Sequence, residues 1–294
     1  MPASTIPRAT LPLLMERYPC LLLDAYGVLV AHDGPLSGAA EAVAHLNASR
    51  HPYFILTNDA SRTPETSSRR YTGMGIAVPP ERIISSGLAL KPYFAAQGMT
   101  GMRCLVLGPE DSERYVRDAG GIPVPLGRDA DADAVVVCDE RGFSFLGVLD
   151  DTLSFLYRKL DAGEPLRLVV ANPDLIYPAS AGRYGFTGGA VALLLEEAMR
   201  LRYPRRTDLV FTRLGKPFAP MFEEALRRSG TRDMVMVGDQ PGTDIRGARR
   251  FGIDSALVTT GITRLDEGAF DEDTRPTWIL ESLSLNGMER RAAP

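Results

Sequence analysis

The stretch Cys20–Leu29 reads CLLLDAYGVL, in which an apolar run stops at Asp24 and a turn glycine follows at Gly27. A buried strand that ends on an acid places that acid at the carboxyl edge of a sheet, where α/β proteins bind their ligands. A carboxylate in this position can attack phosphorus and form an aspartyl phosphate. Taken alone, however, Asp24 is more simply explained as a helix N-cap or a turn acid. The rest of the chain must decide its role.

Composition and charge narrow the class of protein. The 294 residues are 45% hydrophobic and 24% charged, and their net charge is −4. This is an ordinary globular composition with room for a full core, and the charge gives no reason to expect a nucleic acid or a membrane as partner. No signal-peptide pattern or transmembrane run is found. Three cysteines in apolar runs, without metal-ligand spacing, favour a cytoplasmic location.

Short apolar runs alternate with longer stretches of helical period along most of the chain. Regular alternation of this kind predicts an α/β fold, with a parallel sheet covered by helices. The predicted strands are Cys20–Asp24, Tyr53–Thr57, Cys104–Gly108, Ala134–Asp139, Leu168–Ala171, Leu209–Thr212, Met234–Asp239 and Ala256–Thr259.

The middle of the chain has a strand–helix pattern of its own. Within it, only the run Ala134–Asp139 ends on an acid, whereas polar residues follow strands on both sides of it. Turn-forming residues gather near its two ends, at Pro79, Pro80 and Gly87 and again at Pro178 and Gly182. Such clusters are typical of junctions. We therefore expect a core domain of residues 1–83 and 183–294, with a second domain of residues 84–182 inserted into it.

Two polar segments follow apolar runs on either side of this insertion. Thr57 and Asn58 can hold a phosphate through their side chains and the backbone N–H groups beyond them, although a strand-to-helix cap is the commoner explanation. Lys216 is fixed between Gly215 and Pro217. A lysine held at the sheet edge can neutralise phosphate oxygens, and an ordinary turn lysine in solvent is an equally good explanation.

The last polar segment, Met234–Ile245, reads MVMVGDQPGTDI. An apolar strand ends at Asp239, and Asp244 stands at the start of a helix. Two carboxylates on one short loop suit Mg²⁺, which binds a few carboxylates together with waters and phosphate oxygens. Asp244 is also well placed to interact with the helix dipole. For Asp239 we favour metal binding.

The four segments, in order, resemble motifs I to IV of the haloacid dehalogenase (HAD) superfamily of phosphohydrolases, and most closely subclass IIA, the NagD-like and nitrophenyl-phosphatase-like group. The phrases are LLLDAYGVL, FILTNDASRT, RLGKPFAPMFEEAL and MVGDQPGTDIRGARRFGIDSALVTTGIT, and VVANPDLIYP and GFTGGAVALLLE also resemble that group. The resemblance covers residues 21–263, roughly. It implies a Rossmann-like core with an inserted α/β cap of type C2, in agreement with the inserted segment.

The resemblance also implies a Mg²⁺ site. Asp24 would be both the nucleophile and a metal ligand, and Tyr26 would offer its backbone carbonyl to the metal. Asp239 would be a further ligand, and Asp244 would support the site.

The remaining motif residues would bind the substrate. By resemblance, Thr57 and Asn58 would hold the phosphate and orient the nucleophile, and Lys216 would clamp the phosphate. The substrate would be a small phosphorylated metabolite, such as a sugar or polyol phosphate. The cap would close over it and exclude water. A homodimer formed through the caps would be consistent with the family.

Tyr26 departs from the family pattern, which has an aspartate two residues after the nucleophile. That aspartate protonates the leaving oxygen and later activates water, and such help is worth about 10²–10⁴-fold in rate. A branch of subclass IIA has an aromatic residue here, and DAYGVLVAHDG is similar to that branch with a small insertion. Metal and phosphate binding use other groups, so they should survive the change.

Four interpretations of Tyr26 follow. The enzyme acts on substrates with good leaving groups, or His32 or Asp33 replaces the acid, or the phenol itself donates a proton, for which it is poorly matched at neutral pH. In the fourth, the chain is a catalytically weak or inactive protein that binds phosphorylated metabolites.

Two other classes of enzyme are disfavoured. The Asp239/Asp244 pair does not suit haloacid dehalogenation, and no Gly-x-Gly-x-x-Gly follows the first strand, as a Rossmann oxidoreductase requires.

Overall fold

In the computed structural model, which describes residues 6–31, 33–180, 183–261 and 270–285, strand β1 (Cys20–Leu23) lies inside a six-stranded sheet. This first sheet has the order β15-β14-β13-β1-β4-β5, and each neighbouring pair is parallel. Its other strands are β4 (Tyr53–Thr57), β5 (Ile83–Ser85), β13 (Met234–Gly238), β14 (Asp254–Val258) and β15 (Trp278–Leu280).

Both faces of the first sheet are covered, which explains why its strands are mostly apolar. Side chains alternate between the two faces of a strand. Leu21 and Leu23 accordingly pack toward one hydrophobic cluster, and Cys20 and Leu22 toward another. Helices α1 (Leu11–Arg17), α2 (Ala39–Ala48) and α3 (Pro64–Gly73) contribute to the first cluster, and α8 (Ala219–Ser229) and α9 (Arg246–Phe251) to the second.

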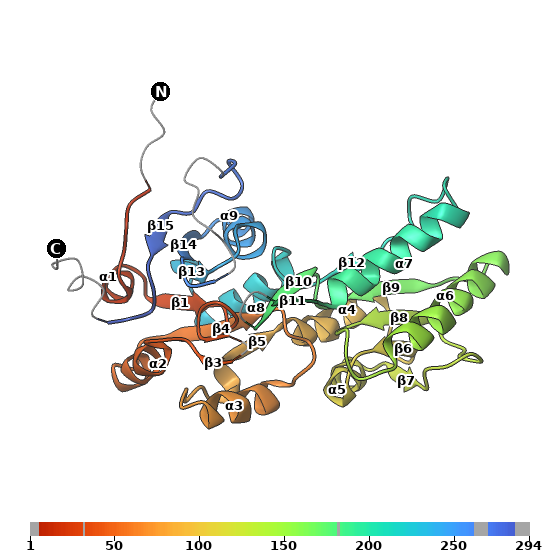
Figure 1. Ribbon diagram of the computed structural model, residues 1–294, viewed down its shortest axis with the longest axis horizontal. Helices are drawn as coiled ribbons and strands as arrows, with labels where there is room; N and C mark the ends of the chain where they lie inside the picture. The colour runs from red at the N-terminus through yellow and green to blue at the C-terminus, as the bar shows by residue number, and fades with distance from the viewer. Residues whose placement is uncertain (1–5, 32, 181–182, 262–269, 286–294) are drawn as a thin grey trace.

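A second parallel sheet forms the other half of the molecule (Figure 1). Among the described residues it has the order β12-β9-β8-β6-β7. Its strands are β6 (Arg103–Leu107), β7 (Ile122–Val124), β8 (Ala134–Val137), β9 (Arg167–Val170) and β12 (Thr212–Arg213). Helices α4 (Leu90–Gln97) and α5 (Glu110–Asp118) contribute to the cluster on one face, and α6 (Phe145–Asp161) and α7 (Gly188–Arg202) to that on the other.

Shorter elements complete the described chain. Two antiparallel hairpins are β2–β3 (Val30–Ala31 and Gly34–Pro35) and β10–β11 (Ile176–Ser180 and Arg183–Phe186). Single turns of helix are η1 (Pro80–Arg82), η2 (Ser86–Ala89) and η3 (Pro241–Ile245). Hairpin β10–β11 lies between the two sheets (Figure 1), where β10 contacts β2. No helix in the described ranges is both long enough and apolar enough to cross a membrane.

The predicted α/β fold with parallel sheets is confirmed, and the predicted ends of the inserted segment need correction. β5 belongs to the first sheet, so the insertion begins after residue 85 rather than at 84. At the other end, α7 and β12 pack with the second sheet, although residues from 183 onward were assigned to the core. Pro178, which suggested the exit, lies in β10. Of the predicted strand Leu209–Thr212, only Thr212 is in β12.

Candidate active site

Three neighbouring strands of the first sheet end in polar side chains. Asp24 follows β1, Thr57 ends β4, and Asp239 follows β13. Because β4, β1 and β13 are adjacent and parallel, these residues meet at one edge of the sheet. The expected convergence of the motif residues at the carboxyl ends of the strands is therefore what the structure shows.

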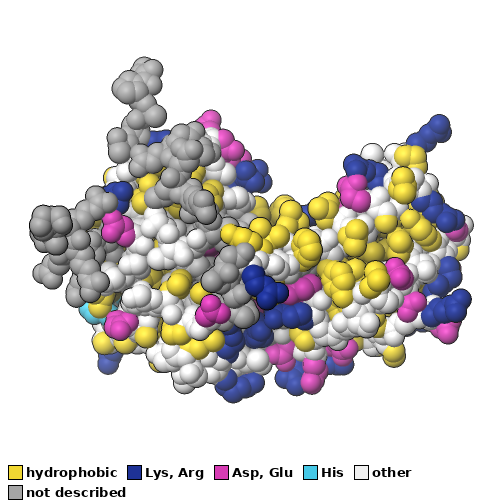
Figure 2. Space-filling view, in the orientation of Figure 1, with side chains coloured by type: hydrophobic (Ala, Val, Ile, Leu, Met, Phe, Trp, Pro, Cys, Tyr) yellow, Lys and Arg dark blue, Asp and Glu magenta, His cyan; other side chains and the backbone are white. Residues whose placement is uncertain are grey.

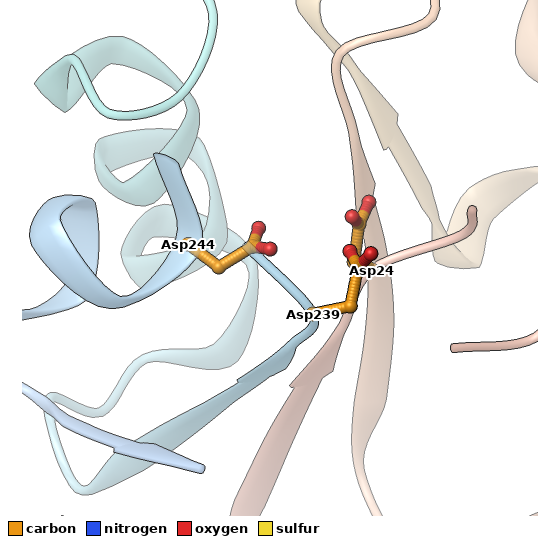
Figure 3. Close-up of side chains that lie close together, drawn as sticks. All are labelled: Asp24, Asp239 and Asp244. Atoms are coloured by element: carbon orange, nitrogen blue, oxygen red, sulfur yellow. The ribbon is translucent and has the colours of Figure 1, made fainter. Parts of the chain in front are cut away.

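Three carboxylates form the centre of this edge. Oxygens of Asp24, Asp239 and Asp244 lie within 4.8 Å of one another. Asp24 and Asp239 extend from adjacent strands, and Asp244 points toward them from η3 (Figure 3). All three are buried, with 6%, 1% and 0% of their surfaces exposed.

The donor set fits Mg²⁺, a hard cation that takes oxygen ligands. Burial raises the pKa of Asp24 well above its ordinary value, and the charges of Asp244 and Asp239 raise it further, while Lys216 acts in the opposite direction. Three carboxylates held so close together are unfavourable when all are ionised. A divalent cation among them would relieve that repulsion.

Lys216 lies between two of these acids. Its Nζ is 2.7 Å from Oδ1 of Asp24 and 2.7 Å from Oδ1 of Asp244, and only 2% of its surface is exposed. Burial alone would lower the pKa of Lys216, but the two carboxylates raise it above the ordinary value. The lysine is therefore a fixed, buried cation beside the candidate nucleophile, and the alternative of a turn lysine in solvent is wrong.

Asn58 holds the Lys216 loop in place. Its Oδ1 accepts a hydrogen bond of 2.7 Å from the backbone N–H of Lys216, and its Nδ2 donates to the Lys216 carbonyl at 3.1 Å and to Asp174 at 2.9 Å. Gly215 permits this approach, because a Cβ there would lie 2.6 Å from Asn58 Oδ1. The Asn58 amide thus positions Lys216. This role is different from the phosphate binding that the resemblance implies for Asn58. Phosphate binding by Asn58 stays a prediction.

Tyr26 lies in the tight turn after Asp24. The turn is closed by a hydrogen bond of 2.9 Å from the Gly27 N–H to the Val30 carbonyl. The half-buried phenol ring contacts the Arg70 guanidinium, with Cζ 5.4 Å from the ring centroid. Gly27 has φ +82°, and a Cβ added to it would lie 2.4 Å from the Asp239 carboxyl carbon. This glycine gives the turn its shape and makes room for the acid.

A small cavity of about 60 Å³ opens at this edge. The first sheet contributes Asp24, Tyr26 and Thr57 to its lining, and the second sheet with its hairpin contributes Glu140, Arg141 and Tyr177. The two halves of the molecule therefore share one cavity. Neither Glu140 nor Arg141 is among the candidate site residues predicted from the sequence.

Charged pairs surround the cavity. Arg62 contacts Asp59 at 2.6 Å, and Arg141 Nε contacts Asp139 at 3.3 Å and Glu140 at 3.1 Å. Burial and the neighbouring Asp139 raise the pKa of Glu140 to about 7. The signal that could have found these residues is Asp139, the acid that ends the run Ala134–Asp139 within the middle segment.

Asp33 and His32 are the two residues that the sequence suggests as replacements for the family acid. Asp33 is exposed on the turn between β2 and β3, and it is not among the described residues that line the cavity. His32 lies outside the described residues. The structure therefore gives no support to Asp33 as the acid.

Comparison with known proteins places the chain in a family. A model of haloacid dehalogenase-like hydrolases matches residues 21–121, and a HAD-hydrolase-like model matches residues 213–285. The crystal structure of a "possible sugar phosphatase, HAD superfamily" from Cytophaga hutchinsonii is 31% identical, with a TM-score of 0.81 over 96% of this chain and 99% of its own. The chain belongs to the haloacid dehalogenase superfamily of hydrolases.

Two further HAD relatives have named activities. The dihydroxyacetone phosphatase of Corynebacterium glutamicum is 27% identical over 265 residues, which are 90% of this chain and 88% of that protein. The glycerol phosphate phosphatase of Mycobacterium tuberculosis, solved in complex with magnesium, is 26% identical, with a TM-score of 0.75 over 94% of this chain and 77% of its own. These HAD relatives are phosphatases, which supports phosphatase activity for this chain.

Proposed function

We propose that the chain is a Mg²⁺-dependent phosphohydrolase of HAD subclass IIA, which hydrolyses a small phosphorylated metabolite through an aspartyl phosphate on Asp24. The observation that carries this proposal is the buried cluster of Asp24, Asp239 and Asp244, with Lys216 Nζ 2.7 Å from two of the three acids. A purely structural ion pair needs only one acid for one lysine. A site that binds both a metal cation and a phosphate needs several carboxylates for the cation and a positive group for the phosphate.

Asp24 is held as a nucleophile should be. Its Oδ1 accepts hydrogen bonds of 2.7 Å from the Ala25 N–H and from Lys216 Nζ, so the orientation of the carboxylate is fixed. Mg²⁺, when bound, would supply positive charge between the carboxylates and the phosphate. Asp24, Asp239 and Asp244, with the Tyr26 carbonyl, would hold it.

Lys216 and Thr57 would bind the phosphate oxygens. Lys216 is kept cationic by Asp24 and Asp244, so it can neutralise charge on the transferring group. Thr57 is buried and lines the cavity. We assign the second sheet, with helices α4–α7 and hairpin β10–β11, the part of a cap that covers the substrate.

The size of the cavity and the relatives favour a small substrate. The cavity is small, with a volume of about 60 Å³. The similar proteins include a dihydroxyacetone phosphatase and a glycerol phosphate phosphatase. A sugar, polyol or triose phosphate is therefore the proposed class of substrate. The three free, buried cysteines agree with a cytoplasmic location.

A panel of phosphate esters tests the proposal. The purified chain is assayed with glycerol phosphate, dihydroxyacetone phosphate, sugar phosphates, a 5′-nucleotide and 4-nitrophenyl phosphate, each with Mg²⁺ and with a chelator. We expect Mg²⁺-dependent release of phosphate from the aryl ester and from at least one small alkyl ester. Absence of turnover across the whole panel would refute the proposed activity.

One observation favours a second function. Tyr26 stands where the family has its general acid, so a protein that binds phosphorylated metabolites without efficient turnover is the alternative. Calorimetric binding of glycerol phosphate, together with no Mg²⁺-dependent turnover of any ester, would support this alternative. Turnover that depends on Asp24 would exclude it.

A homodimer is also proposed. Large apolar side chains are exposed on the half built around the second sheet, where hydrophobic side chains gather on the face shown in Figure 2. They include Tyr184 and Phe186 of β11 and Leu193, Leu194 and Leu201 of α7. Grouped exposed apolar surface is typical of interaction sites, and a second copy of the chain is the occupant that we propose.

A further inference from the structure

We propose that Glu140, in the loop between β8 and α6, supplies the proton that the leaving group needs in place of the missing acid at position 26. This inference rests on the proposed function and adds a catalytic residue to it. An alkyl phosphate releases an alkoxide, which is a poor leaving group unless a proton reaches it. Tyr26 leaves that requirement unmet within the first-sheet half of the site.

Glu140 lies where such a proton is needed. It lines the same small cavity as Asp24 and Tyr26, and it comes from the second-sheet half of the molecule. Only 13% of its side chain is exposed, so bulk water does not dominate its environment. Glu140 and Asp24 therefore line one space that is shared by the two halves of the molecule.

The neighbours of Glu140 favour its protonated form near neutral pH. Asp139 is adjacent, 5% exposed, and its Oδ1 accepts from both the N–H and Nε of Arg141. Burial, followed by the charge of Asp139, raises the pKa of Glu140 to about 7. Arg141 Nε, 3.1 Å away, stabilises the carboxylate that forms when the proton leaves.

Other charged groups face the same cavity. From the loop after β4, Asp59 and Arg62 pair with each other, and Arg62 also interacts electrostatically with Asp139. From β10, the Tyr177 ring lies beneath Arg141, with Cζ 5.9 Å from its centroid. Across the cavity are Tyr26 and the carboxylates Asp24 and Asp239.

Two other carboxyl groups that line the cavity, Asp59 and Asp174, are less suitable. Asp59 accepts hydrogen bonds from the N–H and Oγ of Ser61 and from Arg62, so its oxygens are occupied as acceptors. Burial raises the pKa of Asp174 to about 6, but its Oδ1 accepts from Asn58 and thereby fixes the Lys216 loop. Glu140 has no such structural role in the first-sheet half.

An Asp24 oxygen forms a bond to phosphorus as the bond from phosphorus to the ester oxygen breaks. The electron pair of the broken bond stays on that oxygen, which takes the proton of the Glu140 carboxyl and departs as an alcohol. Water then attacks the phosphorus of the aspartyl phosphate and gives a proton to the Glu140 carboxylate. The bond from phosphorus to the Asp24 oxygen breaks, and its electron pair stays on the Asp24 carboxylate. Inorganic phosphate and free Asp24 result, with Glu140 protonated again.

The test compares two substrates in Glu140→Gln. For glycerol phosphate, we expect kcat/KM to fall by about 10²-fold or more, which is the usual contribution of a general acid. For 4-nitrophenyl phosphate, whose phenolate needs no proton to leave, we expect a change of less than about threefold. Glu110→Gln, an exposed glutamate on α5, is the matched control and should leave both rates unchanged. Asp174→Asn should lower both rates by a similar factor.

Two further measurements do not depend on that variant alone. In the wild type, kcat/KM for glycerol phosphate should fall as pH rises above about 7, and that for 4-nitrophenyl phosphate should not. Tyr26→Asp, added to Glu140→Gln, should restore turnover of glycerol phosphate. If Glu140→Gln fails to fold, the wild-type pH profile decides the matter.

Several results would overturn the inference while the proposed phosphatase activity stands. These are equal losses for both substrates in Glu140→Gln, a substrate-selective loss in Asp174→Asn instead, or wild-type hydrolysis of aryl esters with no hydrolysis of alkyl esters. Failure of the proposed function has a different signature, because no ester would then be hydrolysed by the wild type.

Discussion

At the scale of single residues, Lys216 connects the stability of the site to its chemistry. It is almost fully buried, and it contacts Asp24 and Asp244 at equal distances of 2.7 Å. A buried ion pair adds little net stability over an apolar substitute, but removal of one partner leaves an uncompensated charge in the interior. We therefore expect the lysine to matter for the stability of the fold as well as for the proposed binding of phosphate.

The variant Lys216→Met tests both roles of the lysine. The variant leaves Asp24 and Asp244 buried without their cation, so we expect the free energy of unfolding to drop by about 3–5 kcal/mol, together with loss of turnover. Denaturant-induced unfolding measures the change, and Lys91→Met, at an exposed position on α4, is the control. A drop below about 1 kcal/mol would show that the three charges are not coupled as described.

Residues also show the limits of sequence-based prediction. Asp24, Lys216, Asp239 and Asp244 could be predicted to converge because each stands in a motif beside an apolar strand. The use of the Asn58 amide to hold Lys216 could not, because it depends on contacts with residues more than a hundred positions away. Glu140 was missed because a charged loop has the sequence pattern of an ordinary solvated turn.

At the scale of elements, the turn after β1 determines the shape of the site. Gly27 has φ +82°, a conformation that side chains strongly disfavour, and its α-carbon faces the Asp239 carboxylate. A residue with a Cβ would meet that carboxyl carbon at 2.4 Å. The conformation of the turn and the position of a candidate metal ligand are therefore linked.

Gly27→Ala tests this link against a matched control. Gly75 has nearly the same φ, +80°, but a Cβ there would have no atom within 4 Å. We expect Gly75→Ala to cost about 1 kcal/mol of stability from backbone strain alone. Gly27→Ala should cost more and should also weaken Mg²⁺ binding measured by calorimetry. Equal costs with unchanged Mg²⁺ affinity would contradict the link.

Most helices and strands could be predicted from the sequence, but the sheet to which each one belongs could not. Four strands of the first sheet, β1, β4, β13 and β14, could be predicted as apolar runs because both faces are buried. β5 and β15 have three residues each and give no such signal. The position of α7 and β12 beside the second sheet was not visible, because pairing between β12 and β9 is set by tertiary packing rather than by a local pattern. The two-residue length of β12 also gives little signal.

At the scale of the whole molecule, two parallel sheets meet at one cavity. The hydrogen bond between Asn58 and Asp174 joins the edge of the first sheet that carries Asp24 to the segment after β9. Chemistry is thus assigned to one half and recognition of the leaving group to the other. The inferred role of Glu140 would make the second half part of the chemistry as well.

The exposed apolar residues of α7 and β11 lead to a prediction about assembly. If the proposed homodimer forms there, multi-angle light scattering should give twice the mass of 32.0 kDa. Leu194→Glu, at a side chain with 55% exposure, should shift the protein to monomer because a charge is costly in an apolar interface. A monomeric wild type would refute the dimer, and an unaltered dimer in Leu194→Glu would exclude this face as the interface.

In the proposed function, Asp24, within its cluster of carboxylates and lysine, carries out Mg²⁺-dependent phosphate transfer. The most direct measurement is hydrolysis of 4-nitrophenyl phosphate by the wild type and by Asp24→Asn, each titrated with Mg²⁺. We predict Mg²⁺-dependent turnover by the wild type and a loss of about 10³-fold or more in the variant, as for removal of a nucleophile. Equal turnover by both proteins, or wild-type turnover that a chelator leaves unchanged, would contradict the account.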